Sequence, residues 1–356
     1  MNKDLIEYLD AQLPRWASEL GFQQLGITDC DLGEHDKHLQ RWLKARFHGN
    51  MQYMEKHGAK RSHPAELIPG TLRIISVRMD YLPQSAPAEQ TLENPDLAYI
   101  ARYALGKDYH RLMRKRLKKL IEKIQAYCQQ YQFRPFVDSA PVLEKALAEK
   151  SGLGWIGKNT LLIHPKAGSW FFLGEIFTDL PLTLSPQSPL STHCGSCRAC
   201  LDICPTNAFT KAHQLDARKC IAYLTIEHKD SIPIELRPLM GNRIFGCDDC
   251  QLVCPWNKFA KLSQEIKFQP NHELDRSRLV TLFNWSETEF LARTLGSPLR
   301  RVGYQGWLRN IAVALGNSEG GEEVINALRS RYHDPSDLVR EHVHWALARL
   351  AAQQSV

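Results

Sequence analysis

The sequence predicts a multidomain α+β protein. Three observations support this prediction: strand-like and helix-like patterns mix through the first half, eight of the ten cysteines lie between residues 194 and 254, and the pattern is wholly helical from about residue 285. A chain of 356 residues also exceeds a typical single domain. We therefore expect three domains, at residues 1–185, 186–265 and 266–356.

The first domain is expected to be mixed α/β. Strand-like runs occupy residues 71–78 and 133–137, and helical periodicity covers 4–20, 37–48, 107–130 and 141–151. A Pro- and Ser-rich stretch at 181–192 marks the boundary before the cysteine-rich domain.

A glycine-rich segment, Gly152–Asn159 (GLGWIGKN), matches GxGxxG and comes within one residue of the phosphate-binding pattern GxxxxGK[ST]. Both motifs need a strand before the glycines and a helix after them, because the phosphates rest on the helix N-terminus. Here a helical pattern precedes the loop and strand-like residues follow it. We therefore favour a tight helix-to-strand turn, or close backbone approach to a large flat ligand, over nucleotide binding.

The cysteines form two runs with one residue between them: Cys194-x2-Cys197-x2-Cys200-x3-Cys204-Pro, then Cys220, then Cys247-x2-Cys250-x3-Cys254-Pro. A four-cysteine run ending in Cys-Pro is the bacterial ferredoxin pattern, whose last cysteine binds the other of two 4Fe-4S clusters. One cluster would then be held by Cys194, Cys197, Cys200 and Cys254. The second would be held by Cys247, Cys250, Cys204 and, by elimination, Cys220.

Two other readings of the cysteines remain. Cys-x2-Cys pairs also suit a structural zinc ion, although the x2, x2, x3-Pro spacing fits clusters more closely. A disulfide framework is less favoured, because the chain shows no secretory signal.

Composition favours a cytoplasmic protein outside the membrane. The chain is 43% hydrophobic and 24% charged, which is ordinary globular usage. No stretch approaches the run of about 18 apolar residues that a membrane span needs. No heptad pattern or exposed apolar stripe demands an oligomer, so we expect a monomer.

The formal net charge is +6, and much of the positive charge lies in one run. Residues 107–123 hold eight Lys or Arg against two acids, while apolar residues recur at helical spacing. The helix would thus turn one face inward and present cations outward. This outer face is either an ordinary solvated surface or a site for a polyanion such as RNA, and spacing does not choose between them.

Asp138 is the first candidate for chemistry. It follows an apolar strand and precedes Ser-Ala-Pro, and sites tend to form at strand ends in α/β domains. Burial beside a cofactor would raise its pKa and let it hold a proton near neutral pH. Spacing alone favours a helix-capping role, because Pro141 and a helical pattern follow.

The C-terminal residues 304–317, 321–332 and 336–351 read as three amphipathic helices, the last of them like a HEAT repeat. Independent solenoids need about three repeats, so this segment must pack on the rest of the chain. A cationic concave face was expected from Arg301, Arg309, Arg340, His342 and His344.

Taken together, FVDSAPVLEK, GLGWIGKNTLLIHPKAGSW, the cysteine runs, CIAYLTIEHK and GNRIFGCDDCQLVCPWN closely resemble the epoxyqueuosine reductases along essentially the whole chain. The resemblance implies a nitroreductase-like α/β cobalamin domain, a ferredoxin-like domain with two 4Fe-4S clusters and C-terminal HEAT-like helices. It also implies reduction of epoxyqueuosine to queuosine at the wobble position of tRNA, with Asp138 as the proton donor. This role overrides the cap that spacing favours.

The same resemblance places Arg61, Asp138, Asn159, His164 and Asp248 near the cobalamin, without making His164 a cobalt ligand. It implies two partners, the tRNA anticodon stem-loop and an external electron donor such as flavodoxin or ferredoxin. A corrinoid reductive dehalogenase-like reductase of small molecules, or a plain electron-transfer ferredoxin on a helical scaffold, remains an alternative. The basic helix and the HEAT-like tail argue against a small substrate.

Overall fold

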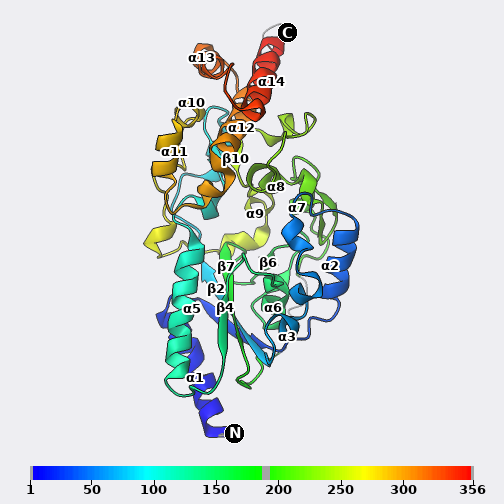
Figure 1. The fold of residues 1–356 in the computed structure, drawn as a ribbon, viewed down its shortest axis with the longest axis vertical. Helices are drawn as coiled ribbons and strands as arrows, with labels where there is room; N and C mark the ends of the chain where they lie inside the picture. Colours follow the sequence, from blue (N-terminus) through cyan, green and yellow to red (C-terminus); the bar gives the residue numbers. More distant parts are fainter. Residues whose placement is uncertain (1–2, 187–192, 354–356) are drawn as a thin grey trace.

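The computed structural model describes residues 3–186 and 193–353 (Figure 1). Part of the predicted boundary stretch, residues 187–192, therefore lies outside the described residues. The α-helices are α1 Lys3–Glu19, α2 His35–Lys44, α3 Pro64–Leu67, α4 Ala88–Glu93, α5 Tyr109–Gln125, α6 Glu144–Lys150, α7 Ala199–Asp202, α8 Ile221–Ile226, α9 Asp249–Leu252, α10 Leu279–Phe283, α11 Glu287–Arg293, α12 Gly303–Gly316, α13 Glu322–Ser330 and α14 Asp337–Gln353. The strands are β1 Gln24–Thr28, β2 Arg73–Asp80, β3 Tyr99–Ile100, β4 Phe133–Phe136, β5 Trp155–Ile156, β6 Leu162–Ile163, β7 Phe171–Thr178, β8 Phe209–Lys211, β9 Gln214–Leu215 and β10 Arg243–Phe245.

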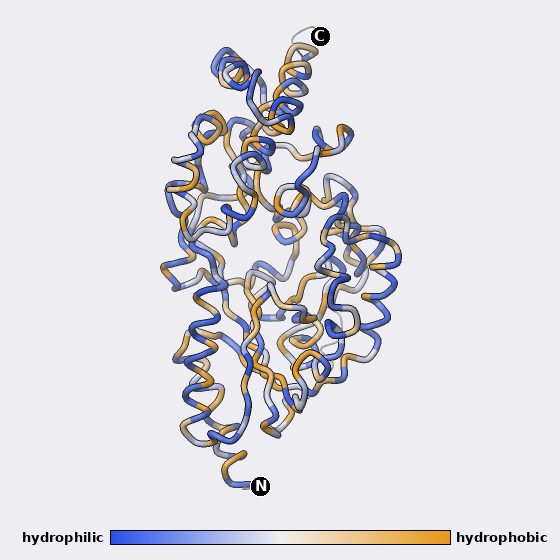
Figure 2. Tube along the Cα trace, in the orientation of Figure 1, coloured by the Kyte–Doolittle hydropathy of each residue, from blue (hydrophilic) through white to orange (hydrophobic). Residues whose placement is uncertain are grey.

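The N-terminal part is built on a four-stranded antiparallel sheet of order β1-β2-β7-β4. Side chains alternate between the two faces of a strand. Ile75 and Ile176 accordingly pack on α1 and α5, whereas Ile74 and Phe177 pack on α6. Figure 1 shows α5 lying beside the sheet, and Figure 2 shows hydrophobic and hydrophilic residues mixed along that helix. The predicted inward apolar face of the basic helix is confirmed.

Every helix and strand predicted in the first half is present, with ends shifted by a few residues. The glycine-rich loop joins the end of α6 to a short hairpin of β5 and β6. This helix-to-strand order confirms the turn and is the reverse of the order that a phosphate-binding loop needs. Among the described residues, no helix combines the length and apolar content needed to cross a membrane.

The C-terminal part is helical, as predicted. Buried residues of α10 to α14 form one hydrophobic cluster, which also takes in side chains from residues 98–105 and from β10. β3 pairs in parallel with β10, so a segment of the N-terminal half is hydrogen-bonded into the C-terminal half. The helical part therefore packs on the rest of the chain, as its short length requires.

The expected cationic concave face is wrong for two of its residues. Arg309 is 0% exposed, and its guanidinium donates to the carbonyl oxygens of Leu224, His228 and Asp230. His342 is also fully buried, and its Nε2 accepts the backbone N–H of Ile232. Both side chains hold the 221–232 segment against α12 and α14, because buried carbonyl and amide groups need partners.

We predict that Arg309→Met lowers the free energy of unfolding by about 3 kcal/mol, because the carbonyls it serves lose their donor in a buried place. Urea unfolding followed by tryptophan fluorescence measures this. Arg329→Met, at an exposed position of α13, is the matched control and should change the free energy by less than about 0.5 kcal/mol. Equal effects of the two changes would contradict the structural role of Arg309.

Candidate active site and cluster cysteines

Asp138 lies just beyond β4, where the chain leaves the edge strand of the sheet. Its φ is +40°, in a region that non-glycine residues uncommonly adopt, and Asp is among those that tolerate it best. Such a conformation persists only where the surroundings hold it, and it often marks a functional site. The side chain is 42% exposed, so its carboxylate is open to a ligand.

The carboxylate of Asp138 is held by two residues at the start of α5. The Tyr109 hydroxyl donates to Oδ2 at 2.7 Å, and His110 Nε2 lies 3.1 Å from the same oxygen. Phe172 stacks on the Tyr109 ring with centroids 3.7 Å apart. Every hydrogen bond made to this carboxylate by the described residues falls on Oδ2, so Oδ1 has no hydrogen-bond partner among them.

His110 is clamped between two carboxylates. Asp108 is the N-cap of α5: its Oδ1 accepts the backbone N–H of His110 at 2.9 Å and lies 2.7 Å from the ring Nδ1. Since Nε2 meets Asp138, both ring nitrogens have acidic partners. This arrangement favours an imidazolium, which donates from both nitrogens.

The proton between His110 and Asp138 therefore resides on the imidazole. Burial lowers the pKa of His110, but the hydrogen bonds and charges of Asp108 and Asp138 outweigh it and raise the pKa to about 9. Burial raises the pKa of Asp138, yet hydrogen bonds from His110 and Tyr109 bring it below its ordinary value. Hydrogen bonding to the charged form thus outweighs burial in this arrangement, and the predicted rise of the Asp138 pKa beside a bound cofactor stays a prediction.

The capping role that spacing favours for Asp138 is also wrong. Helix α6 begins at Glu144 with Leu143 at its N-cap, five residues further on. Glu144, the first residue of α6, contacts the loop that carries Asp138. Its Oε2 accepts the backbone N–H of Asp138 at 3.2 Å. Burial and the Asp138 charge raise the pKa of Glu144 to about 8. Arg61, which is 7% exposed, approaches the Ala140 carbonyl of the same loop at 3.5 Å.

The two predicted cysteine groups are both compact. A cavity is lined together by Cys194, Cys197, Cys200 and Cys254, the set that the crossing pattern assigns to one cluster. Burial and the charges of the other three raise the pKa of Cys200 to about 11. Burial raises the pKa of Cys250, and the charges of Cys220, Asp248, Cys200 and Cys204 add to the rise, so Cys250 lies near cysteines of both groups. The Ala208 N–H donates to Cys204 Sγ at 3.3 Å, as a thiolate ligand would require.

Among the residues that the structure describes, no three His, Cys, Asp or Glu side chains converge closely enough for a single metal ion. The preference for clusters over zinc rests on the x2, x2, x3-Pro spacing of the cysteines in the sequence.

Two further predicted residues lie against the second cysteine group. Asp248 is 2% exposed, and its Oδ2 accepts from the Tyr99 hydroxyl at 2.9 Å and the Arg102 N–H at 2.8 Å. Burial raises its pKa to about 6. Asn159, also buried, donates from Nδ2 to the Cys250 carbonyl at 3.3 Å.

His164 lies at the end of β6, where its Nδ1 accepts the backbone N–H of Lys166 at 3.2 Å. Burial and the positive charges of Arg78 and Lys166 lower its pKa to about 4. The ring is therefore neutral near physiological pH, and no hydrogen bond among those of the described residues joins it to Asp138.

Tyr103 connects the acid–base cluster with Asp248 and the C-terminal part. Burial raises the pKa of this phenol, Arg301 opposes the shift, and Asp138 and Asp248 add to it, so all three charges lie nearby. Its ring centroid is 6.4 Å from that of Tyr109. Asp138, Asp248 and Arg301 thus surround one region where the parts of the chain meet.

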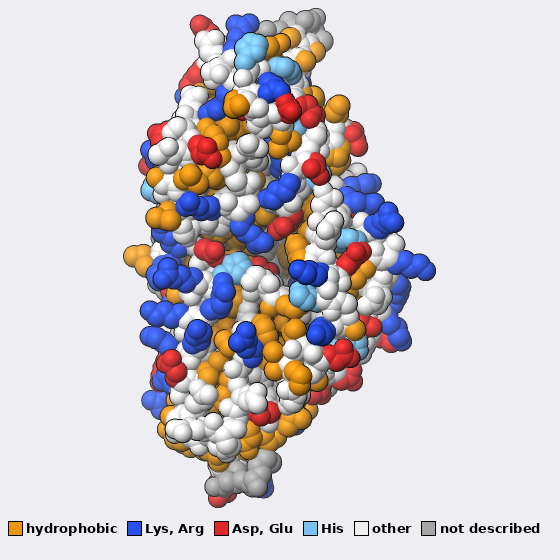
Figure 3. Space-filling model, viewed as in Figure 1, with side chains coloured by type: hydrophobic (Ala, Val, Ile, Leu, Met, Phe, Trp, Pro, Cys, Tyr) orange, Lys and Arg blue, Asp and Glu red, His pale blue; other side chains and the backbone are white. Residues whose placement is uncertain are grey.

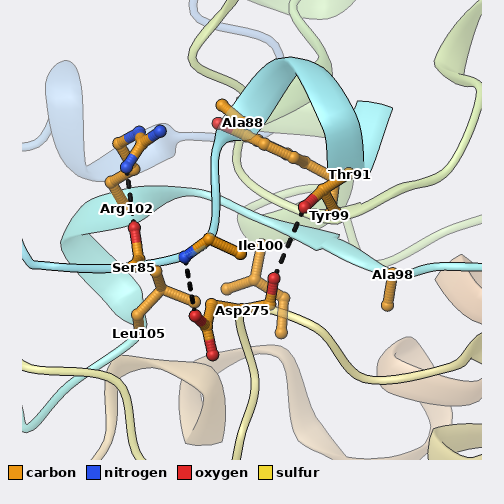
Figure 4. A pocket seen from close by; sticks show the side chains of 10 residues that line it. Ser85, Ala88, Thr91, Ala98, Tyr99, Ile100, Arg102, Leu105 and Asp275 are labelled. Atoms are coloured by element: carbon orange, nitrogen blue, oxygen red, sulfur yellow. Dashed lines mark hydrogen bonds between the residues drawn. The ribbon is translucent and has the colours of Figure 1, made fainter. Parts of the chain in front are cut away.

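A second small cavity lies beside β3 (Figure 4). Its polar groups are already paired with one another: Asp275 Oδ2 accepts the Ala86 N–H at 2.8 Å, and Arg102 donates to Ser85 Oγ at 2.7 Å. We interpret this cavity as a gap where segments of the chain pack together, since few unpaired polar groups remain for a ligand.

Sequence reasoning missed Asp108, Tyr109, His110 and Glu144. Only Asp108 carried a local signal, because an Asp two residues before a His at a helix start is an N-cap pattern. Nothing in the sequence shows that this helix end meets residue 138. That contact depends on β4 pairing with β7 while α5 packs across the same sheet.

Eight cysteines in two groups, together with the His110–Asp138 acid–base pair, define an iron–sulfur redox enzyme. Comparison with known proteins agrees. Residues 61–139 match the family "Epoxyqueuosine reductase QueG, DUF1730", and residues 193–257 match a 4Fe-4S double cluster binding domain. The second match confirms the prediction of two 4Fe-4S clusters.

The relatives extend along nearly the full chain. An epoxyqueuosine reductase of Pseudomonas aeruginosa is 63% identical, covering 94% of this chain and 92% of the relative, and that of Escherichia coli K12 is 54% identical, covering 97% and 90%. A crystal structure of an epoxyqueuosine reductase with an epoxyqueuosine-modified tRNA-Tyr stem loop aligns with TM-score 0.88 at 28% identity, covering 97% of this chain and 91% of that one. The chain belongs to the epoxyqueuosine reductase family.

We predict that His110→Gln destabilises the protein in a pH-dependent way. The folded-state pKa of His110, about 9, exceeds its ordinary 6.5, so its stabilising effect is complete below 6.5 and is lost as the pH rises through 9. Melting temperatures of wild type and variant should differ below pH 6.5 and converge above pH 9. His57→Gln, at an exposed position, is the control and should show no such convergence. A difference that is constant with pH would exclude the ion pair.

Proposed function

We propose that this chain reduces epoxyqueuosine to queuosine at the wobble position of tRNA, using bound cobalamin and two 4Fe-4S clusters. The observation that carries the proposal is the 63% identity to an epoxyqueuosine reductase along nearly the whole chain. The reaction takes up two electrons and two protons, removes the epoxide oxygen as water and leaves an alkene. The chain must therefore deliver both electrons and protons to one place.

We assign the three parts to three tasks. Residues 1–185 would form the nitroreductase-like, cobalamin-binding catalytic domain, residues 186–265 the ferredoxin-like domain, and residues 266–356 the HEAT-like, tRNA-binding domain. The antiparallel sheet that carries Asp138, the cysteine groups and the terminal helices fall in these ranges in that order.

When bound, cobalamin supplies the low-valent cobalt that reduces the epoxide-bearing ring. We propose that Arg61, Asn159, His164 and Asp248 line its site together with Asp138. The residues fit a polar ligand: Nε of Arg61 is buried and lacks a hydrogen-bond partner among the described residues. Neutral His164 would act as a hydrogen-bonding group, with no bond to cobalt assumed.

The proton reaches the leaving oxygen through Asp138. His110 Nε2 would hold a proton against Oδ2, while Oδ1 accepts no hydrogen bond from the described residues. Transfer from the imidazolium to the carboxylate, followed by rotation about Cβ–Cγ, presents an acid to the epoxide oxygen, which would otherwise leave as a poor alkoxide. Tyr109 aligns the carboxylate for the transfer, and its hydrogen bond to Oδ2 breaks as the acid rotates.

The test is anaerobic turnover of epoxyqueuosine-containing tRNA with added cobalamin and a chemical reductant, with nucleosides identified by mass spectrometry. We predict that wild type forms queuosine and that Asp138→Asn is slower by about 10²- to 10⁴-fold, the usual contribution of general acid catalysis. Iron and cobalamin content are measured in both proteins, and the rates are compared per bound cobalamin. No queuosine from fully loaded wild type would contradict the function, and full activity of the variant would contradict the role of Asp138.

We further propose that the tRNA contacts the exposed face of α5. Figure 3 shows Lys and Arg side chains gathered over this helix, and Arg111, Arg114, Lys115, Lys118 and Lys119 are exposed. An anticodon stem-loop is dense in phosphate, so cations in a row suit it.

Reversing Arg114, Lys115 and Lys118 to Glu should weaken tRNA binding and reduce its dependence on salt by about one unit of log–log slope per lost phosphate contact. Binding isotherms at several salt concentrations measure both. Lys211→Glu in β8 is the control and should bind tRNA like wild type. Unchanged affinity and slope in the triple variant would place the RNA elsewhere.

A further inference from the structure

The two cysteine groups differ in their exposure. Cys197 is exposed, and so are its neighbours His193, Gly195, Ser196 and Arg198. In the second group, by contrast, the neighbouring residues Gly246, Asp248, Asp249 and Gln251 are buried. Helices α7 and α9, which follow Cys197 and Cys247, contact each other, so the groups are neighbours. The exposed group can therefore meet another protein, whereas the second faces Asp248 and the site.

Positively charged side chains stand around the exposed cysteines. Lys158 lines their cavity, and its Nζ donates to the carbonyls of Gly195 at 2.6 Å and Cys197 at 2.8 Å. Arg198 is the residue next to Cys197, and the β8–β9 hairpin, which carries exposed Lys211, binds the Lys158 carbonyl through the His213 N–H at 3.0 Å. Arg198 has one acidic partner, Asp202, at 3.1 Å. The surface is therefore predominantly cationic.

Aromatic side chains continue from the cavity to the surface. Trp256 lines the cavity, and its ring lies 5.6 Å from that of His193 and 6.0 Å from that of Phe259. Phe259 is 43% exposed, and Lys258 Nζ lies 4.9 Å from its ring centroid. On the first cysteine run, Ile203 is 46% exposed beside Cys204. An apolar centre with a charged rim is the usual composition of a protein–protein interface.

We infer that the surface formed by Lys158, Arg198, Lys211, Lys258 and Phe259 docks an acidic one-electron carrier protein, which reduces the cluster held by Cys194, Cys197, Cys200 and Cys254. The inference rests on the proposed function in requiring that the clusters are present. Each docking oxidises the carrier by one electron and reduces the cluster by one, with no bond made or broken. Two dockings supply the two electrons of the epoxide reduction.

Charge complementarity selects the acidic partner. A cationic rim steers an acidic protein toward the exposed cysteines and raises the association rate at low salt. RNA would also be attracted by these cations, but it gains nothing from exposed cluster ligands. Because Cys197 lies beside these cations, we favour an electron carrier over RNA as the occupant. RNA binding at this surface is one of the outcomes that the experiment distinguishes.

The experiment measures how fast reduced flavodoxin bleaches the cluster absorbance of the anaerobic, cluster-loaded protein in a stopped-flow instrument. With wild type, the bimolecular rate should fall as salt rises. Lys211→Glu with Lys258→Glu should slow reduction by flavodoxin about tenfold or more at low salt. Reduction by dithionite, a small inorganic reductant, should be unchanged and shows that the clusters are intact.

Lys115→Glu with Lys118→Glu on α5 is the matched control, with the same charge change, and should be reduced by flavodoxin like wild type. Equal rates in all three proteins, or a rate independent of salt, would overturn the inference. So would loss of tRNA binding in the Lys211/Lys258 variant with normal reduction, which would make this surface an RNA site. If the double variant loads clusters poorly, Lys258→Gln, which lies outside the cysteine runs, decides instead.

The outcomes separate this inference from the proposed function. Slow reduction in the Lys211/Lys258 variant would support the docking surface even if the wild type failed to convert epoxyqueuosine. Conversely, conversion with a chemical reductant would stand if flavodoxin reduced every variant equally.

Discussion

The candidate active site depends on one interaction, the hydrogen bonding of Asp138 Oδ2 by Tyr109 and His110. It requires that the loop after β4 and the first turn of α5 meet, although they are about one helix apart in the chain. The sheet supplies this geometry, because β4 pairs with β7 while α5 packs across the same strands. Asp108 completes it by capping the helix and fixing the ring of His110. The packing at this end of the sheet therefore holds Asp138, in its uncommon backbone conformation, beside His110.

Protons and electrons would approach the region near Tyr103 from two different sides of the molecule. In the proposed reaction, protons would come from the α5 side, where His110 and Glu144 have raised pKa values. Electrons would come from the cysteine side, where Cys197 is exposed and the second group adjoins buried Asp248.

Much of the fold and the presence of two 4Fe-4S clusters could be predicted from sequence, because both are encoded locally. Periodicity of 3.6 or 2 residues shows helices and strands, and cysteine spacing shows the crossing of Cys254 into the first group. The failures involve partners distant in sequence. Asp138 looks like a cap until Tyr109 and His110 are placed beside it, and Arg309 looks like a surface cation until the carbonyls of the 221–232 segment surround it. Such pairings depend on tertiary packing, which one sequence does not display.

The most direct test of the central claim is the protonation state of His110 in the resting protein, read from ¹⁵N-labelled histidine NMR with His110→Gln to assign the signal. The account predicts an imidazolium at neutral pH, with both ring nitrogens protonated and a titration near pH 9. A neutral ring at pH 7, or an imidazolium that titrates near the ordinary value of 6.5, would contradict it, because Asp138 would then lack the neighbouring proton on which its role depends.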